Sequence, residues 1–295
     1  MQTEKIIYAL GFFDGVHRGH QMLLRACRQF ADHMGCKAGA VTFDTHPETL
    51  VAGRAPFLLN TMEDRKKLLA AHHMDRILVL PFDETLRSLP WQEFLEKLLV
   101  SGAIGFVCGD DFRFGFRGEG NAEKLSEFCR EKGLCWTVVP AQSLGDTRIS
   151  STYIRQLLEA GEIEIANKFL GHPHILTGTV VSGRQLGRTI GIPTANLLLP
   201  SGVLCPVYGV YACKALVNGQ TYIAVTNIGT RPTVEGEGVT VEPWLLDFEG
   251  DLYGKEMTLE FHGFLRPEKK FGSLEELQAE IRKNAEETRK FFAES

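Results

Sequence analysis

The pattern of hydrophobic and polar residues changes once along the chain. In the first part, short apolar runs alternate with stretches in which apolar residues recur every three or four positions. The short runs predict buried parallel strands, and the longer spacing predicts amphipathic helices. This alternation is typical of an α/β domain whose parallel sheet is covered on both faces. The expected strands are residues 6–10, 38–43, 76–80, 104–108 and 134–139, and the expected helices are residues 23–34, 61–72, 91–99 and 121–132.

From about residue 171 the apolar segments become short, rich in β-forming residues and separated by turns. This pattern predicts an antiparallel barrel or sandwich. A closing helix is expected after Ser273, which suits an N-cap, with an apolar stripe at Leu274, Leu277 and Ile281. The chain is therefore expected to have two domains, residues 1–170 and 171–295. The strands expected in the second are residues 176–181, 209–217, 221–228, 239–248 and 256–261.

Composition narrows the function classes. The net charge of -5 does not indicate a nucleic-acid-binding surface. Seven cysteines without a CxxC pair predict free thiols in a reducing compartment. The N-terminus lacks a signal-like segment, and no apolar run reaches the roughly 18 residues that span a bilayer. These features indicate a cytoplasmic protein that binds no membrane.

The segment of residues 11–20, Gly-Phe-Phe-Asp-Gly-Val-His-Arg-Gly-His, follows the first strand and opens the first helix. Open α/β sheets bind ligands at this edge, and a helix N-terminus suits a phosphate. His17 and His20, with Gly19 between them, can face one phosphate and stabilise charge that develops at phosphorus. The alternatives are half of a metal site or two solvated side chains. Metal-binding pairs on helices are more often four residues apart, and no third ligand stands beside these.

A second segment, residues 148–155, begins another helix with Arg-Ile-Ser-Ser-Thr-Tyr-Ile-Arg. The hydroxyls of Ser151 and Thr152 can bind phosphate oxygens at the helix start, and Arg155 can add a charge-assisted contact one turn later. The alternative is an ordinary capped helix with a surface arginine.

A third segment, residues 182–196, is rich in glycine and arginine and ends in Gly-Ile-Pro-Thr-Ala-Asn. It lacks the Gly-Lys-Ser/Thr ending of a Walker A loop. Its hydroxyl and amide oxygens are nevertheless the hard ligands that Mg²⁺ prefers beside a nucleotide. The alternative is a polar β-turn. The candidate ligands here are Gly183, Arg188, Thr194 and Asn196.

Glu242 lies in an otherwise apolar strand, which makes it the candidate general base for attack of a hydroxyl on a γ-phosphate. Pro243 follows it and cannot donate a ladder hydrogen bond. The strand is therefore expected to be an edge strand, or to be bulged, at this point.

Four segments, residues 11–20, 42–47, 109–115 and 149–155, together resemble the bacterial FAD synthetases of the nucleotidyltransferase superfamily. Thr45 departs from the family pattern, which usually has proline there. The resemblance implies a Rossmann-like domain in which His17 and His20 contact ATP phosphates, and in which Ser151, Thr152 and Arg155 hold the outgoing pyrophosphate. It also places Gly11, Phe12, Asp14 and Gly19 in the phosphate-binding block. Asp111 is expected beside the flavin or the adenylyl group, and Phe112 beside the flavin. Core packing is the alternative for Phe112.

The segments of residues 191–196, 241–248 and 265–271 resemble riboflavin kinase. This resemblance implies a six-stranded barrel with a terminal helix. It further implies that Thr194 and Asn196 bind Mg-ATP, that Glu242 activates the ribityl 5′-hydroxyl, and that Arg266 and Phe271 close over the flavin.

Together the resemblances imply a bifunctional enzyme. Its small-molecule substrates and products are riboflavin, FMN, FAD and ATP, with Mg²⁺ accompanying ATP. One domain phosphorylates riboflavin to FMN, and the other adenylylates FMN to FAD and releases pyrophosphate. The alternatives are a single-activity enzyme with one decayed domain and a non-catalytic flavin-binding regulator.

Overall fold

The structure is a computed structural model that describes residues 4–51, 56–182, 191–233 and 236–294. The chain divides into two compact units, Met1–Leu58 with Met62–Ser151, and Leu59–Thr61 with Thr152–Ser295. Helix α8 (Ile163–Leu170) and all but the first residue of α7 (Ser151–Glu159) therefore group with the second unit. The two units thus divide after Ser151, and the domain boundary expected after residue 170 stays a prediction.

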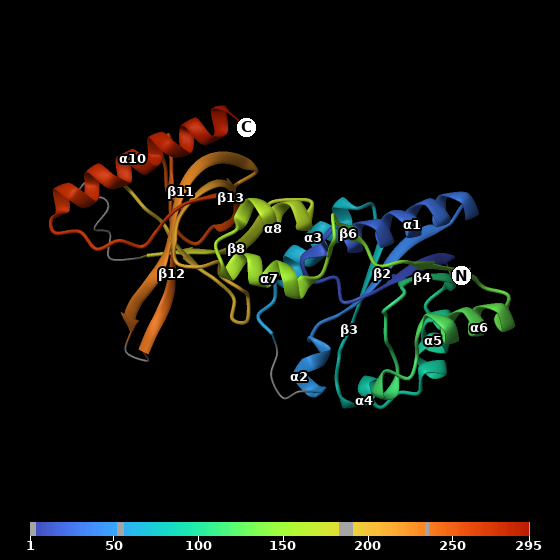
Figure 1. Ribbon diagram of the computed structural model, residues 1–295. Coiled ribbons are helices and arrows are strands. Elements are labelled where there is room, and N and C mark those ends of the chain that lie inside the picture. The colour runs from blue at the N-terminus through green and yellow to red at the C-terminus, as the bar shows by residue number, and fades with distance from the viewer. Residues whose placement is uncertain (1–3, 52–55, 183–190, 234–235, 295) are drawn as a thin grey trace. The chain divides into compact units, whose positions relative to one another are not determined.

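A five-stranded parallel sheet forms the centre of the first unit, as predicted (Figure 1). Its strand order is β3-β2-β1-β4-β5. The chain thus builds outward from β1 in one direction and then returns to add β4 on the other side. The strands are β1 (Ile6–Leu10), β2 (Lys37–Phe43), β3 (Arg76–Leu80), β4 (Ala103–Gly109) and β5 (Cys135–Val139).

Strand β1 is buried along its whole length, which explains why its sequence is continuously apolar. Successive side chains of a strand point to opposite faces. Ile7 and Ala9 accordingly pack in one core cluster and Tyr8 and Leu10 in the other. The first cluster includes side chains of α1 (Arg18–Met34) and α3 (Met62–Ala71), and the second those of α5 (Trp91–Val100) and α6 (Ala122–Lys132).

Short elements complete the first unit. Three of them, at residues 14–16, 47–51 and 116–118, follow β1, β2 and β4, at whose carboxyl ends the motif segments lie, so they belong to the edge of the sheet at which ligands are expected. The short elements are η1 (Asp14–Val16), α2 (Pro47–Val51), α4 (Glu84–Arg87), η2 (Phe116–Gly118), β6 (Ser143–Leu144) and β7 (Thr147–Arg148).

The second unit contains a closed barrel of strand order β10-β11-β12-β9-β8-β13, so the expected six-stranded antiparallel barrel is confirmed (Figure 1). Strand β9 is short and pairs at three positions with β8 and at one position, Val241↔Leu197, with β12. The strands are β8 (His174–Val181), β9 (Asn196–Leu198), β10 (Gly209–Val217), β11 (Gln220–Thr233), β12 (Gly236–Leu245) and β13 (Glu256–Pro267).

The expectation of an edge or a bulge at Pro243 is wrong. Strand β12 lies between β11 and β9, and its register with β11 is unbroken through Pro243↔Thr226. The Pro243 carbonyl accepts a hydrogen bond from Ala195 N at 2.9 Å. The N–H and C=O of one strand residue point to the same side. Proline at this position therefore lacks an N–H group on the side of the segment before β9, and no hydrogen bond between β12 and β11 is lost.

Strand β12 also ends earlier than expected, at Leu245 instead of residue 248. Asp247 has a φ of 60°, a left-handed conformation that does not continue a strand. The Asp247 carboxylate accepts a hydrogen bond from Arg289 at 2.7 Å, which ties this turn to the terminal helix.

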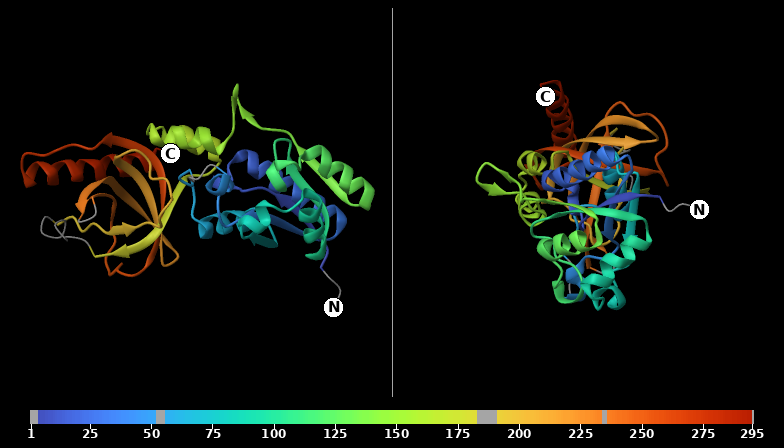
Figure 2. Two further views of the ribbon diagram at one scale, coloured as in Figure 1. Left: turned by 90° about the horizontal axis from the view of Figure 1, so that it is seen from below. Right: turned by 90° about the vertical axis from the view of Figure 1, so that its right-hand side faces the viewer.

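The terminal helix α10 (Leu274–Ala293) begins at the predicted cap, where Ser273 Oγ accepts from Glu276 N at 3.2 Å. It lies along the outside of the barrel in Figure 1 and in the left view of Figure 2, and Ala285 packs with Val210 and Val225. Among the described helices none is long and apolar enough to cross a membrane. All seven cysteines lie in the described part of the chain and are free thiols, as expected.

Candidate active sites

The turn between β1 and α1 has an unusual backbone. Phe13 and Val16 have φ values of 60° and 39°, and Gly15 between them has a φ of 75°. Left-handed conformations are rare for residues other than glycine, above all for β-branched ones, and each costs about 1–3 kcal/mol. Such strain is concentrated at functional sites, and here it lies directly before the two candidate histidines.

His17 and His20 form one stacked pair. His17 is the N-cap of α1, and its Nδ1 accepts a hydrogen bond from His20 N at 3.3 Å. The two ring centroids are 3.6 Å apart, with an angle of 12° between the ring planes. A Cβ atom at Gly19 would lie 3.2 Å from the His17 ring, so glycine makes room for this ring against the helix start.

The environment favours a neutral imidazole at His20. Burial lowers the pKa of His20 well below its usual value, and the charges of His17 and Arg65 lower it further. Since His17 Nδ1 accepts a hydrogen bond, the proton of its neutral ring lies on Nε2. His20 Nδ1 is buried, so Nε2 is the atom through which this ring can reach a ligand. In both rings, therefore, Nε2 is the atom that can contact a ligand.

A cavity of about 480 Å³ lies at this turn and joins the predicted blocks. Its wall includes residues that follow β1, β4 and β5, so it occupies the point where the strand order reverses. Doubly wound sheets bind ligands at this point. The lining residues are His17, Gly19, His20, Leu23, Gly109, Asp110, Asp111, Val139, Pro140, Ala141, Gln142, Arg148, Ile149, Ser150 and Ser151.

Two contacts hold the second block at this cavity. Ser151 Oγ donates to the Asp14 carbonyl at 3.0 Å, which links the start of α7 to the turn after β1. Arg148 forms an ion pair with Asp111, the residue predicted beside the flavin. Arg148 and Gln142 were not among the predicted site residues, although Arg148 begins the quoted block.

The other residues predicted for the adenylyltransferase site do not line this cavity. Gly11, Phe12 and Asp14 form the turn behind the cavity and do not line it. Thr152 and Arg155 group with the second unit, so their roles toward pyrophosphate stay predictions. Phe112 stacks with Phe114 at 5.6 Å and packs against a core cluster, which favours the core-packing alternative.

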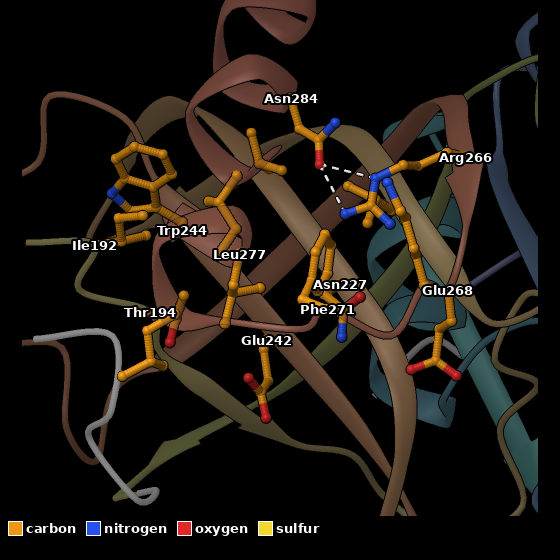
Figure 3. Close-up of a pocket in the computed structure, with 15 residues that line it drawn as sticks. Ile192, Thr194, Asn227, Glu242, Trp244, Arg266, Glu268, Phe271, Leu277 and Asn284 are labelled. Carbon is orange, nitrogen blue, oxygen red and sulfur yellow. Dashed lines mark hydrogen bonds between the residues drawn. The ribbon is translucent and has the colours of Figure 1, made fainter. Parts of the chain in front are cut away.

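The barrel contains a second cavity, of about 320 Å³ (Figure 3). Much of its wall is apolar, and Thr194 and Glu242 lie at one end, away from Arg266 and Asn284. A wall of this kind suits a flat aromatic ligand with a few fixed polar contacts. The lining residues are Ile192, Thr194, Val210, Val225, Asn227, Glu242, Trp244, Arg266, Glu268, Lys269, Phe271, Leu274, Leu277, Ile281 and Asn284.

Arg266 is held rigidly at this cavity. Its Nε and Nη2 donate to Asn284 Oδ1 at 3.1 and 3.0 Å, and Nε lies 3.5 Å from Glu280 Oε1. The guanidinium lies 5.7 Å from the centroid of the Phe271 ring. Both residues predicted to close over the flavin therefore line the same cavity. Asn284, which was not predicted, is 1% exposed and fixes Arg266.

A smaller cavity of about 70 Å³ lies against the segment that carries Thr194. Thr194 lines both barrel cavities, and the neighbours Glu242 and Pro243 line one each. Asn196 begins β9 and is not among the lining residues of either. Gly183 and Arg188 lie outside the described residues.

The first unit thus has a phosphate-type site at the reversal point of a nucleotide-binding fold, and the second has a barrel site with a carboxylate and a hydroxyl beside an apolar cavity. These features define a two-site phosphate-transferring protein. The comparisons narrow the class: residues 1–153 match the family model of FAD synthetase, and residues 170–292 match that of riboflavin kinase. The chain belongs to the bifunctional riboflavin kinase/FMN adenylyltransferase family, which confirms the resemblance stated from the motifs.

Relatives of that name support the assignment over the full length. The Listeria monocytogenes protein is 36% identical, over 97% of this chain and 92% of its own. The Escherichia coli protein is 38% identical, over 98% of this chain and 93% of its own. A crystal structure named macrolide-efflux protein, from Streptococcus pneumoniae, is 30% identical with a TM-score of 0.88, and the match covers 98% of this chain and 95% of that one.

Proposed function

We propose that this chain makes FMN from riboflavin at the barrel cavity and FAD from FMN at the cavity beside His17 and His20, with ATP as the second substrate of both reactions. The observation that carries the proposal is the joint placement of residues from both nucleotidyltransferase blocks around the first cavity, in one chain with a barrel that holds Glu242 at a second cavity. All substrates are small molecules, and the cytoplasm is the proposed location.

In FAD formation, an oxygen of the FMN phosphate attacks the α-phosphorus of ATP, and the bond to the β-phosphate oxygen breaks to release pyrophosphate. The Nε2–H groups of His17 and His20 donate to phosphate oxygens as negative charge develops there. Neutral rings serve this role, since two stacked imidazolium ions would repel each other. Ser151 and Arg148 shape the opposite wall, and Asp111 is fixed by its ion pair with Arg148.

In FMN formation, the 5′-hydroxyl of riboflavin attacks the γ-phosphorus of ATP, ADP leaves, and Glu242 accepts the hydroxyl proton. The isoalloxazine ring occupies the apolar part of the cavity between Trp244 and Leu277, under Arg266 and Phe271. Thr194 lies between this cavity and the smaller one, so the triphosphate of ATP is proposed to pass Thr194 with its base toward the smaller cavity.

Mg²⁺ enters the barrel site with ATP. The Thr194 hydroxyl and the Asn196 side-chain oxygen would hold it, and hard oxygen ligands of this kind suit Mg²⁺, whose shell phosphates and water complete. When bound, Mg²⁺ supplies charge neutralisation at the phosphates.

The test separates the two reactions in one protein. The purified chain is incubated with Mg-ATP and either riboflavin or FMN, and the flavins are separated by chromatography. Glu242→Gln is expected to abolish FMN formation from riboflavin while FAD formation from added FMN continues. His20→Ala is expected to have the opposite effect.

Matched controls change exposed residues of the same type. Glu286→Gln on α10 and His33→Ala on α1 are expected to leave both reactions unchanged. No FMN from the unmodified chain refutes the kinase proposal, and FMN without FAD refutes the adenylyltransferase proposal. If His20→Ala retains FAD formation, the role assigned to the histidines is wrong.

A further inference from the structure

Arg65 on α3 is an anomaly in the first unit. Its side chain is fully buried, at 0% exposure, although arginine is among the residues least often buried. Only Nη1 makes a hydrogen bond within the described part of the chain, while Nε and Nη2 are buried without a partner. A buried charge with unused donors is costly, so its retention calls for a physical reason.

Arg65 contacts the end of β2 and, through Thr42 and Phe12, the strained turn after β1. Nη1 donates to the Phe43 carbonyl at 2.9 Å and to Thr42 Oγ1 at 3.3 Å. Thr42 Oγ1 in turn donates to the Phe12 carbonyl at 2.7 Å. The guanidinium also stacks on the Phe12 ring, 4.0 Å from its centroid.

Phe12 directly precedes the left-handed residues that aim α1 at the cavity. Two sets of hydrogen bonds thus hold the turn. Thr42 of β2 accepts from Arg65 of α3 and donates to the Phe12 carbonyl, and the Ser151 hydroxyl donates to the Asp14 carbonyl. Several tethers of this kind are what an over-determined, strained turn requires. Arg65 is not among the residues that line the cavity, and its hydrogen bonds and ring contact are made to β2 and to the turn.

We propose that Arg65 is a positioning residue for adenylyl transfer: together with Thr42 it fixes the turn from Phe12 to Val16 and thereby the placement of His17 and His20 at the cavity. This inference rests on the proposed role of the two histidines. Transition-state stabilisation depends on donors held in place before the reaction, so release of the turn lowers the rate of the chemical step.

The charge of Arg65 provides a second, electrostatic effect. It lowers the pKa of His20, after burial and the neighbouring His17. The other charged groups of this region are Asp14, which acts on Arg65, and Asp110, Asp111 and Arg148, which line the same cavity as His20; Arg148 is paired with Asp111. Loss of the arginine charge therefore shifts protonation of His20 to higher pH, an effect that a purely structural role of Arg65 would not produce.

The experiment uses three variants of the full chain. Arg65→Met removes the charge but keeps much of the volume, Arg65→Lys keeps the charge but loses the planar fork, and Thr42→Val removes the hydroxyl at nearly constant shape. FAD formation from FMN and Mg-ATP is measured from pH 5 to 9. Riboflavin phosphorylation by the same sample reports on the second unit, and the fluorescence of Trp91 and Trp136 reports on folding of the first unit, which contains Arg65. His33→Ala is the matched control.

Arg65→Met is expected to lower kcat for FAD formation by about ten- to a hundredfold, as a misplaced catalytic group does. The acid limb of its kcat/KM profile should move to higher pH, while the kinase rate is unchanged. Arg65→Lys and Thr42→Val should lower kcat with the acid limb in place. If the fluorescence shows that the first unit of Arg65→Met fails to fold, the other two variants decide.

Wild-type rates of FAD formation in Arg65→Lys and Thr42→Val overturn the inference, as does a folded Arg65→Met with a wild-type rate and an unmoved pH profile. His20→Ala, run in parallel, separates the two proposals. If His20→Ala abolishes FAD formation while all Arg65 and Thr42 variants retain it, only the positioning role fails. If His20→Ala retains FAD formation, the underlying histidine role fails first.

Discussion

His174, the first residue of β8, is a buried base in the barrel unit, and its titration leads to a measurable loss of stability in acid. The side chain is 1% exposed, and its ring lies 5.8 Å from that of Phe261. The His174 backbone N–H donates to Asn167 Oδ1 at 2.8 Å, so the residue is fixed where α8 meets the barrel. Burial and the neighbouring His172 lower the pKa of His174 from 6.5 to about 3, and the Leu204 carbonyl offsets this only in part.

The sign follows from proton linkage. Between pH 6.5 and 3 the unfolded chain binds a proton at His174 that the folded barrel does not bind. Stability is therefore fully present above pH 6.5 and falls as the pH drops below it. At 1.36 kcal/mol per pKa unit, the 1.5 units between pH 6.5 and pH 5 correspond to a loss of about 2 kcal/mol from this one residue.

The measurement is urea unfolding at pH 7 and pH 5, followed by the fluorescence of Trp244 in a chain in which Trp91 and Trp136 are replaced by phenylalanine. His174→Phe in the same background keeps a ring of similar size and removes the titration. The difference in unfolding free energy between the two pH values should be about 2 kcal/mol smaller in His174→Phe than in its parent.

Other titrating groups cancel in that comparison, because both proteins contain them. His33→Phe on the exposed face of α1 is the matched control and should behave like the parent. Equal acid sensitivity of His174→Phe and its parent would refute the reasoning, since it would mean that His174 binds its proton equally well in the folded and unfolded states.

Three further outcomes are expected. Ser151→Ala removes the hydrogen bond to the Asp14 carbonyl, worth about 0.5–1.5 kcal/mol, and should slow FAD formation about two- to tenfold with kinase activity intact, as steady-state kinetics would show. Asn284→Ala frees the Arg266 guanidinium and should raise the KM for riboflavin roughly tenfold, while FAD formation from FMN is unchanged. Gly178→Ala places a Cβ atom 2.4 Å from the Leu198 carbonyl oxygen, so urea titration of the barrel should show a loss of about 1–3 kcal/mol.

The sequence predicted the structure best where a regular hydrophobic pattern began or ended at a recognisable capping or turn residue. The continuous apolar run of β1 and the Ser273 cap of α10 were recognised because burial on both faces and capping leave direct traces in local sequence. The motif residues His17, His20, Thr194 and Glu242 were likewise found from local order, and the structure places each at a cavity.

What the sequence did not reveal depends on contacts between distant segments. Arg65 stands in the run Glu-Asp-Arg-Lys-Lys and has the appearance of a solvated helix face, and only the fold brings it beneath Phe12. Strand β9 has three residues, too few for a period, and exists because barrel closure supplies its partners. The error at Pro243 has the same origin: whether a missing donor matters depends on which neighbour it faces.

The shortness of β9 has a thermodynamic consequence for the barrel. A single residue pair, Val241↔Leu197, joins this strand to β12, so the pairing that closes the barrel at this point has the fewest paired residues. Thr194, proposed to bind Mg-ATP, lies two residues before that strand. A nucleotide that binds only the closed form adds its binding free energy to closure. Among the barrel strands, the amide protons of β9 and of the facing part of β12 should therefore exchange with solvent fastest in the free protein and be slowed most by Mg-ATP. The substrate would then stabilise the closed barrel to which it binds.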